Sequence, residues 1–285
     1  MLRVLANIRR PAVAGTFYPS SSGSLKNLLE QLFSSSKAKL FPLPKFSKLI
    51  GIVSPHAGYE YSGYVAARGY SILKSYAPNS SRAIILGPNH RGIGSIISSS
   101  TKEYWATPLG NVKVDVEGVI LLSKSSKIID LDEYSHAYEH SIEVQLPFLQ
   151  HIYGSDFKII PICMMEQDKH FALEVADAIL KILDSEKDII VASSDFTHYE
   201  PHNEAQKKDL TLINFIEKLD VDGFYDCLYS MNITACGFGP IAVLMAISKS
   251  LGMSGSKLVS YMTSGDVIGD YDQVVGYASI AFGKW

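Results

Sequence analysis

Residues 188–199 read DIIVASSDFTHY, an apolar run that passes directly into a polar segment with an aspartate and a histidine. A short run that is apolar at every position is typical of a strand buried on both faces of a parallel sheet. The same pattern, an apolar run followed by a histidine, occurs in IGIVSPHAGY at residues 50–59 and in AIILGPNHRG at residues 83–92. The three stretches together predict an α/β fold with a mainly parallel sheet.

The rest of the chain alternates between strand-like and helix-like segments. The strand candidates are residues 49–53, 83–86, 158–162, 188–192, 257–262 and 274–282. Amphipathic spacing predicts a helix after Ser24 as its N-cap, and further helices over 171–183, 209–219 and 241–251. Residues 104–116 contain a turn signal between two β-prone runs and predict a hairpin. We therefore expect residues 1–285 to form a single α/β domain with a mainly parallel central sheet and helices on both faces.

Composition excludes several classes of protein. The 285 residues are 47% hydrophobic and 19% charged, with a net charge of -3, so no basic surface for nucleic acid is expected. No apolar run reaches the roughly 18 to 20 residues that cross a bilayer, so we expect no membrane partner. Arg9 and Arg10 follow a short apolar stretch, the reverse of a secretory signal, which favours a cytoplasmic protein.

Polar residues follow the three buried strands, and parallel strands end at one edge of a sheet. His56, His90, Asp195 and His198 are therefore expected to converge, although a single histidine in such a place can simply cap a loop. Cys236 precedes a helix predicted to begin near Pro240, and a helix N-terminus favours the thiolate form of cysteine. Cys236 is thus a candidate metal ligand or nucleophile, the alternative being a small buried apolar residue.

The other cysteines and a second histidine cluster are less specific. Cys163 and Cys227 lie in apolar context, and no CxxC spacing indicates a zinc ribbon or a disulfide framework. If residues 136–143 are helical, His136, Glu139, His140 and Glu143 share one face, which can bind a metal ion. A solvated polar face explains the same spacing equally well.

Six motifs in sequence order resemble the Memo family. They are VAGTFYP at 13–19, SPHAGYEYSG at 54–63, LGPNH at 86–90, EHSIEVQLPFL at 139–149, SSDFTHY at 193–199 and the Cys-Gly pair at 236–237. The resemblance runs from about Val13 to the final strand. It implies a fold similar to that of LigB-type class III extradiol dioxygenases.

The resemblance also implies a set of site residues. The family's metal-binding pair and thiol fall on His56, His90 and Cys236. Asp195, His198 and His140 are then expected to line the same cleft as catalytic residues. LigB-type enzymes hold ferrous iron with two histidines and a carboxylate, and use a further histidine as a base. His198 matches that base, whereas Cys236 stands where those enzymes have the carboxylate.

The roles of the remaining residues follow from general chemistry. Asp195 can orient a ligating histidine through its second ring nitrogen, and His198 or His140 can transfer a proton. Tyr59, Tyr61 and Tyr199 are expected to form an aromatic wall of the cleft.

Three functions remain open from the sequence. The first is a metal-dependent redox protein linked to oxygen, with iron or copper favoured over zinc as the transition metal. The second is a non-catalytic adaptor that binds a peptide or a small ligand in the same cleft. The third is a hydrolase with a metal ion on the face from His136 to Glu143. The substrate and the oligomeric state do not follow from the sequence.

Overall fold

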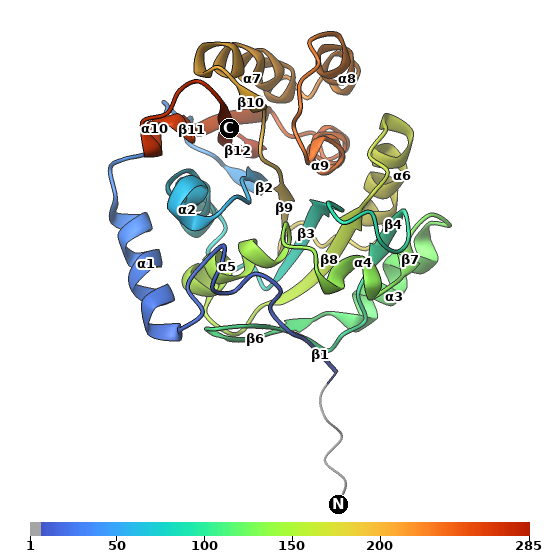
Figure 1. The fold of residues 1–285 in the computed structure, drawn as a ribbon. Coiled ribbons are helices and arrows are strands. Elements are labelled where there is room, and N and C mark those ends of the chain that lie inside the picture. Colours follow the sequence, from blue (N-terminus) through green and yellow to red (C-terminus); the bar gives the residue numbers. More distant parts are fainter. Residues whose placement is uncertain (1–6) are drawn as a thin grey trace, which may run out of the picture.

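Five neighbouring strands in the middle of the sheet run parallel to one another, in the computed structural model that describes residues 7–285 (Figure 1). In spatial order they are β6 (Gly110–Val114), β8 (Lys158–Met164), β3 (Arg82–Pro88), β9 (Asp188–Ser193) and β2 (Lys48–Ser54). The expected α/β fold with a mainly parallel central sheet is confirmed.

Antiparallel strands flank this parallel centre. On one side β12 (Val274–Lys284) pairs antiparallel with β2, β11 (Gly255–Thr263) and β10 (His198–Glu200). On the other side β5 (Tyr104–Thr107) forms a hairpin with β6, as residues 104–116 predict, and β1 (Ile8–Arg9) pairs with β5. Short strands β4 (Ile97–Ser99) and β7 (Asp130–Leu131) extend from β8. The sheet is therefore mixed at its edges and parallel where the candidate histidines follow it.

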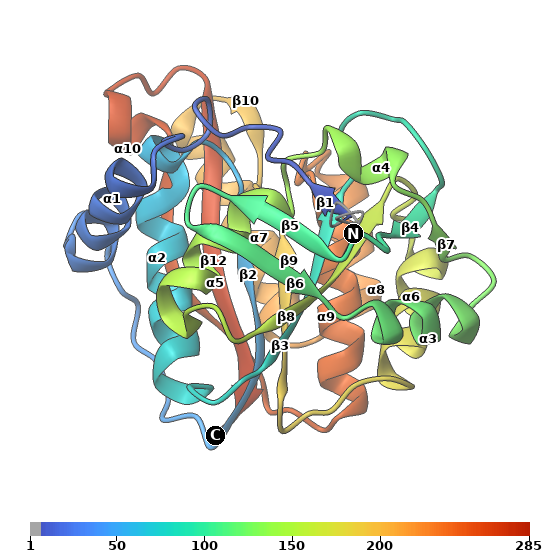
Figure 2. The same cartoon turned by 90° about the horizontal axis from the view of Figure 1, so that it is seen from below.

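Helices cover both faces of the sheet (Figures 1 and 2). One face is covered by α1 (Ser22–Ser34), α2 (Tyr59–Tyr76) and α5 (Leu146–Tyr153). The other face is covered by α3 (Val116–Ser125), α6 (Lys169–Leu180) and α9 (Phe238–Ser250). α7 (His202–Glu217) packs on β11 and β12, and α8 (Val221–Ser230) packs between α7 and α9. Two short helices, α4 (Tyr134–Ala137) and α10 (Gly265–Ile268), complete the set in the described residues.

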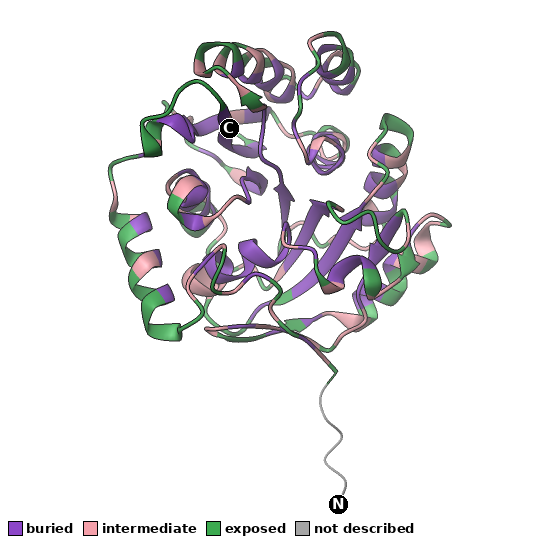
Figure 3. Ribbon diagram, in the orientation of Figure 1, coloured by how far each residue is buried: buried purple, intermediate pink, exposed green. Residues whose placement is uncertain are grey.

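The core lies between the sheet and these two helical layers, where the central strands are buried over nearly their whole length (Figure 3). Ile84, Ile85, Ile190 and Val191 are fully buried, which explains why their segments are apolar at every position. Burial of each such side chain contributes about 1.5–3 kcal/mol relative to exposure. All six strands expected from the sequence are present, each one to three residues longer than its apolar run.

Some helix boundaries differ from the prediction. The N-cap of α1 is Ser21, whose Oγ accepts a hydrogen bond from the Ser24 backbone N–H at 3.2 Å, so the prediction of Ser24 as the cap was wrong. Helix α9 begins at Phe238, and Pro240 is its third residue instead of its first. Helix α7 begins at His202, seven residues before the apolar spacing becomes visible at Asp209.

The longest helix, α2, was not predicted from the sequence. It lies between α1 and the sheet, so it has buried residues on opposite sides and no single apolar stripe. Its glycines allow this close packing. A Cβ atom at Gly63 would lie 2.7 Å from Leu32 of α1, and a Cβ at Gly69 would lie 2.3 Å from Ser279 of β12. These two glycines lower the helix propensity of α2, but its close packing against α1 and β12 requires them.

Residues 136–143 do not form one helix. Helix α4 ends at Ala137, and the next helical segment is a 3₁₀ turn over Glu143–Gln145. His136, Glu139, His140 and Glu143 therefore share no common helical face.

No helix in the part of the chain that the structure describes is long and apolar enough to cross a membrane.

Glu143 anchors the N-terminal segment to the sheet edge. Its buried carboxylate accepts hydrogen bonds from the Arg9 guanidinium at 2.6 Å, the Tyr18 hydroxyl at 2.6 Å, and the backbone N–H groups of Ala12 and Val13 at 2.7 and 3.0 Å. The hydrogen bonds from these donors replace the hydration that the carboxylate loses on burial.

Asp209 anchors the loop after β9. Its Oδ1 accepts from the backbone N–H and the hydroxyl of Thr197 at 3.0 and 2.6 Å, and its Oδ2 accepts from the Tyr261 hydroxyl at 2.8 Å. Thr197 lies between Asp195 and His198, so this carboxyl group positions both of them. Burial raises the pKa of Asp209 to about 6, although the hydrogen bonds from Thr197 and Tyr261 act in the opposite direction.

Replacement of Glu143 tests the buried ion pair. Glu143→Ala leaves the buried Arg9 guanidinium without its charge partner and is expected to lower the free energy of unfolding by about 3–5 kcal/mol. Guanidinium chloride denaturation measures this change. The exposed Glu30 of α1 provides the control, because Glu30→Ala should change stability by less than about 0.5 kcal/mol. The double variant R9M/E143L, which removes both charges, should be more stable than Glu143→Ala. Equal stability of the two would contradict the account.

A second prediction concerns the pH dependence of stability. The pKa of Asp209 in the folded protein, about 6, lies above the unfolded value of about 3.9. Wild type therefore has its full stability relative to Asp209→Asn below about pH 4, and loses about 3 kcal/mol of it as pH rises from about 4 through 6. Urea denaturation of both proteins between pH 4 and 7 measures the difference. Asp226→Asn, at an exposed position of α8, should show a constant offset from wild type. A constant offset for Asp209→Asn as well would contradict the prediction.

Candidate metal centre

Three histidines meet at the carboxyl edge of the parallel strands. His56 follows β2, His90 follows β3, and His140 precedes the 3₁₀ turn over Glu143–Gln145. One ring nitrogen from each of the three lies within 4.8 Å of the others. The ring centroids are 5.1 Å apart for His56 and His90, 5.4 Å for His56 and His140, and 4.7 Å for His90 and His140. The predicted convergence of His56 and His90 is therefore present, with His140 as the third member.

The cluster is buried at one end and open at the other. His56 is 2% exposed, the side chain of His140 is 14% exposed, and that of His90 is 31% exposed. Phe17 of the N-terminal segment packs on the ring of His140, with centroids 4.6 Å apart. Solvent or a ligand reaches the group from the side of His90.

His56 has a defined partner at each polar atom. Its backbone N–H donates to Oδ1 of Asp195 at 2.8 Å. Its ring Nδ1 lies 2.9 Å from the Ser193 hydroxyl, and its Nε2 lies 3.1 Å from Sγ of Cys236. The imidazole is thus held between a serine at the end of β9 and the candidate thiol.

Glu139 is the carboxylate beside the other two histidines. Its Oε2 accepts from the His90 backbone N–H at 2.7 Å. Its Oε1 accepts from the backbone N–H groups of His140 and Ser141, both at 2.8 Å. The same Oε1 lies 3.0 Å from Nδ1 of His90 and 3.3 Å from Nδ1 of His140. Burial would raise the pKa of Glu139, but the hydrogen bond and positive charge of His90, together with His140, lower it to about 2.

The local electrostatics favour neutral imidazoles. Burial, reinforced by the neighbouring histidines, lowers the pKa of His56 well below its usual value. Burial also lowers the pKa of His140 to about 4, despite the opposing charge of Glu139. Both rings are therefore unprotonated at neutral pH, and only a neutral imidazole has a lone pair for a metal ion.

Cys236 lies beside His56, outside the group of three nitrogens. Its Sγ accepts a hydrogen bond from the Asp195 backbone N–H at 3.3 Å. Burial, and next the charge of Asp195, raise the pKa of the thiol, so the expected lowering by the helix N-terminus is not found. Desolvation of the thiol beside His56 and Asp195 outweighs the effect of the helix. Deprotonation of Cys236 at neutral pH thus requires a cation beside it.

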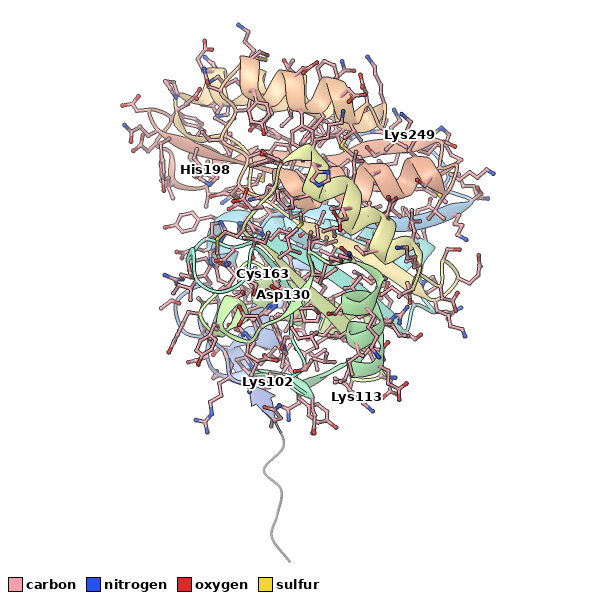
Figure 4. All side chains as sticks on the ribbon, turned by 90° about the vertical axis from the view of Figure 1, so that its right-hand side faces the viewer. Lys102, Lys113, Asp130, Cys163, His198 and Lys249 are labelled. Atoms are coloured by element: carbon pink, nitrogen blue, oxygen red, sulfur yellow. The ribbon has the colours of Figure 1, made fainter. Side chains whose placement is uncertain are left out.

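Asp195 and His198 complete the surroundings of the three histidines. Asp195 holds the backbone of His56, and its pKa is raised to about 6 by burial. Its hydrogen bond with His56 is to the backbone N–H, whereas Ser193 and Glu139 lie within hydrogen-bond distance of ring nitrogens of His56 and His90. His198 donates its backbone N–H to the Thr234 hydroxyl at 2.8 Å, and its Nδ1 lies 2.9 Å from the Thr234 carbonyl oxygen. Figure 4 shows His198 near one edge of the molecule and Lys249, at the end of α9, near the opposite edge.

Other residues singled out in the sequence lie elsewhere. Tyr59 is buried and donates its hydroxyl to the Val144 carbonyl oxygen, whereas Tyr199 is 72% exposed. Cys163 and Cys227 are buried free thiols, as their apolar context indicates. His136 packs against Trp105, and Glu143 is paired with Arg9. His136 and Glu143 are thus engaged away from Glu139 and His140, and the four residues do not form one metal-binding face.

Sequence reasoning missed the two residues that hold the histidine rings, Glu139 and Ser193. Each had a signal. Glu139 directly precedes His140, and Ser193 is the last residue of a buried strand whose carboxyl end faces the site. The spacing of Glu139 instead indicated a helical face, because local periodicity does not reveal which loop a side chain meets.

The chain is similar to known proteins over nearly its whole length. The family model described as Memo-like protein matches residues 9–281. A MEMO1 family protein of Methanopyrus kandleri is 45% identical over 283 residues, covering 96% of this chain and 98% of the relative. MEMO1 family proteins of Methanosarcina mazei and Saccharolobus islandicus are each 46% identical, over 275 and 285 residues. Those alignments cover 96% and 97% of this chain and 98% and 99% of the two relatives.

A solved structure supports the fold alone. The crystal structure of an uncharacterized protein from Escherichia coli K12 superposes with a TM-score of 0.54 at 12% sequence identity. The match covers 83% of this chain and 100% of that chain. The family match, the identities over nearly full length and the six ordered motifs agree, and the chain belongs to the Memo family.

Proposed function

We propose that the chain is a metal-dependent redox protein whose centre is formed by His56, His90 and His140, with Cys236 as a sulfur donor beside them. The observation that supports it is the group of three ring nitrogens within 4.8 Å of one another. Bringing three imidazoles together costs free energy, because neutral imidazoles at a partly open site gain little from one another's proximity. The group therefore points to a function.

The donor set fits a transition-metal ion. Imidazole nitrogens suit iron, copper and zinc, and a thiolate adds preference for the softer ions among them. The ring nitrogens of His56 and His90 that face Ser193 and Glu139 are hydrogen-bonded, and Nδ1 of His140 lies 3.3 Å from Glu139. One nitrogen of each ring is therefore left for a metal. Iron or copper, when bound there, would supply redox chemistry with oxygen.

His198 is the proposed proton acceptor. A carbonyl oxygen only accepts hydrogen bonds, so the contact with Thr234 places the proton of the neutral His198 ring on Nδ1. Its Nε2 then has a free lone pair and can take a proton from a bound substrate. Asp195, with a pKa of about 6, is the proposed second proton carrier, and it also holds the backbone of His56.

Metal analysis tests the ligands. Protein purified without a metal-affinity tag, then loaded with Fe(II) or Cu(II) and dialysed, should retain one ion per chain. His56→Ala, His90→Ala and His140→Ala should each weaken binding by roughly 10-fold or more. His170→Ala is the control, because the side chain of His170 is 80% exposed on α6. Cys236→Ser should keep the ion but lose sulfur-to-copper charge-transfer absorption. Full retention of metal by all three histidine variants would contradict the proposed centre.

Oxygen consumption with catechol-type compounds tests the redox role. His198→Ala should lower the rate by about 10²- to 10⁴-fold with an unchanged metal content, because it removes only the proton acceptor. His202→Ala is the control, because His202 is the first residue of α7 and its ring contacts the Thr263 hydroxyl. A metal-loaded protein that consumes no oxygen with any catechol or reductant would contradict the redox proposal and favour the adaptor.

A further inference from the structure

The hydrogen-bond partners of the three histidine rings determine where each ring proton lies. A neutral imidazole has one N–H donor and one bare nitrogen, and its tautomer follows from the chemistry of the groups around it. All three rings at the candidate metal centre have such partners.

Ser193 determines the tautomer of His56. The Ser193 hydroxyl has a single proton, which it donates to the Ser141 carbonyl oxygen at 2.7 Å. It also accepts a hydrogen bond from the side-chain amide of Gln145 at 2.8 Å. That amide nitrogen is identified because it also donates to the Pro55 carbonyl oxygen at 3.0 Å. With its only proton already used, Ser193 has to accept from His56, so Nδ1 of His56 is protonated.

Glu139 determines the tautomers of His90 and His140. An ionised carboxylate can only accept hydrogen bonds. Oε1 of Glu139 lies 3.0 Å from Nδ1 of His90 in a hydrogen bond, so this nitrogen has to be a donor. The same Oε1 lies 3.3 Å from Nδ1 of His140, where the negative charge of the carboxylate disfavours a bare lone pair and favours a proton. The backbone N–H groups of His90, His140 and Ser141 occupy the remaining acceptor positions. Every neighbour of this carboxylate is therefore a donor.

We propose that Glu139 and Ser193 are positioning residues that hold all three imidazoles as the Nδ1–H tautomer before any metal binds. Nε2 is then the bare nitrogen of each ring. The inference rests on the proposed metal centre only in that a metal ion would use these three nitrogens. The two positioning groups are separate, since Ser193 acts on His56 alone and Glu139 acts on the other two rings.

Nitrogen-15 NMR of the histidine rings in the metal-free, full-length protein tests the proposal directly. Wild type should show Nδ1–H signals and bare Nε2 signals for the neutral rings of His56, His90 and His140. Mixed or Nε2–H tautomers in wild type would overturn the proposal, whatever the protein does with metals.

Glu139→Met is the decisive variant, because it keeps the length of the side chain but removes both acceptor oxygens. Without an acceptor beside Nδ1, nothing holds the proton there, so His90 and His140 should populate the Nε2–H tautomer. Glu133→Met is the control, since Glu133 accepts from Ser100 and Thr101 away from the rings. Unchanged tautomers in Glu139→Met would overturn the role of Glu139.

Ser193→Ala should change the ring signals of His56 and leave those of His90 and His140 as in wild type. Ser248→Ala is the matched control, because Ser248 is equally buried and its hydroxyl has no hydrogen-bond partner among the described residues. If Ser193→Ala leaves His56 unchanged, Ser193 is not a positioning residue.

Co(II) titration supplies the second measurement. Loss of a carboxylate that orients ligating histidines is expected to weaken Co(II) binding by about 10- to 100-fold in Glu139→Met, with wild-type affinity in Glu133→Met. Equal affinity in Glu139→Met and wild type would overturn the proposal. Failure of wild type to bind Co(II), Fe(II) or Cu(II) would instead refute the proposed metal centre. The positioning roles of Glu139 and Ser193 would still be tested by the ring tautomers that NMR measures.

Discussion

The buried carboxylate of Glu139 is the interaction on which the histidine cluster depends. It binds the backbone and the ring of His90, and the backbone of the segment at His140 and Ser141. His90 follows a strand, whereas His140 belongs to a loop without regular structure. A carboxylate with several N–H donors is strongly stabilised in its ionised form, so it joins these two parts of the chain in one arrangement. The two rings are consequently held in a stack, with centroids 4.7 Å apart.

The same edge of the sheet combines strong packing with costly polar groups. The strands that lead to His56, His90 and Asp195 have apolar, buried central segments, which makes their carboxyl ends rigid. Polar groups placed directly after such strands lose water, and the pKa values of the site reflect this loss. The imidazoles become harder to protonate, and the thiol of Cys236 and the carboxyl of Asp195 become harder to ionise. A cation among them would replace the missing solvation, which is the physical basis for a metal centre here.

Much of the fold followed from local sequence, because buried parallel strands have a composition that few other elements share. The segments around Ile84 and Ile190 are apolar throughout, and the structure contains them as β3 and β9. The positions of His56, His90 and Asp195 at one edge followed from the topology of parallel sheets. Helix α2 did not follow, since Gly63 and Gly69 break the usual periodicity to allow contact with α1 and β12.

The sequence by itself thus determined the α/β sheet, the Memo-family motifs and the place of His56 and His90 after neighbouring strands. Only the tertiary structure decided that His140 completes their group, that Glu139 and Ser193 hold the rings, and that Glu143 binds Arg9 instead of a metal. The physical reason is that a buried strand is specified by the hydrophobicity of its own residues. A hydrogen bond between loops depends instead on which loops meet in the folded chain. Glu139 and Glu143 are four residues apart in similar sequence, and only their surroundings in space distinguish a positioning group from an anchor.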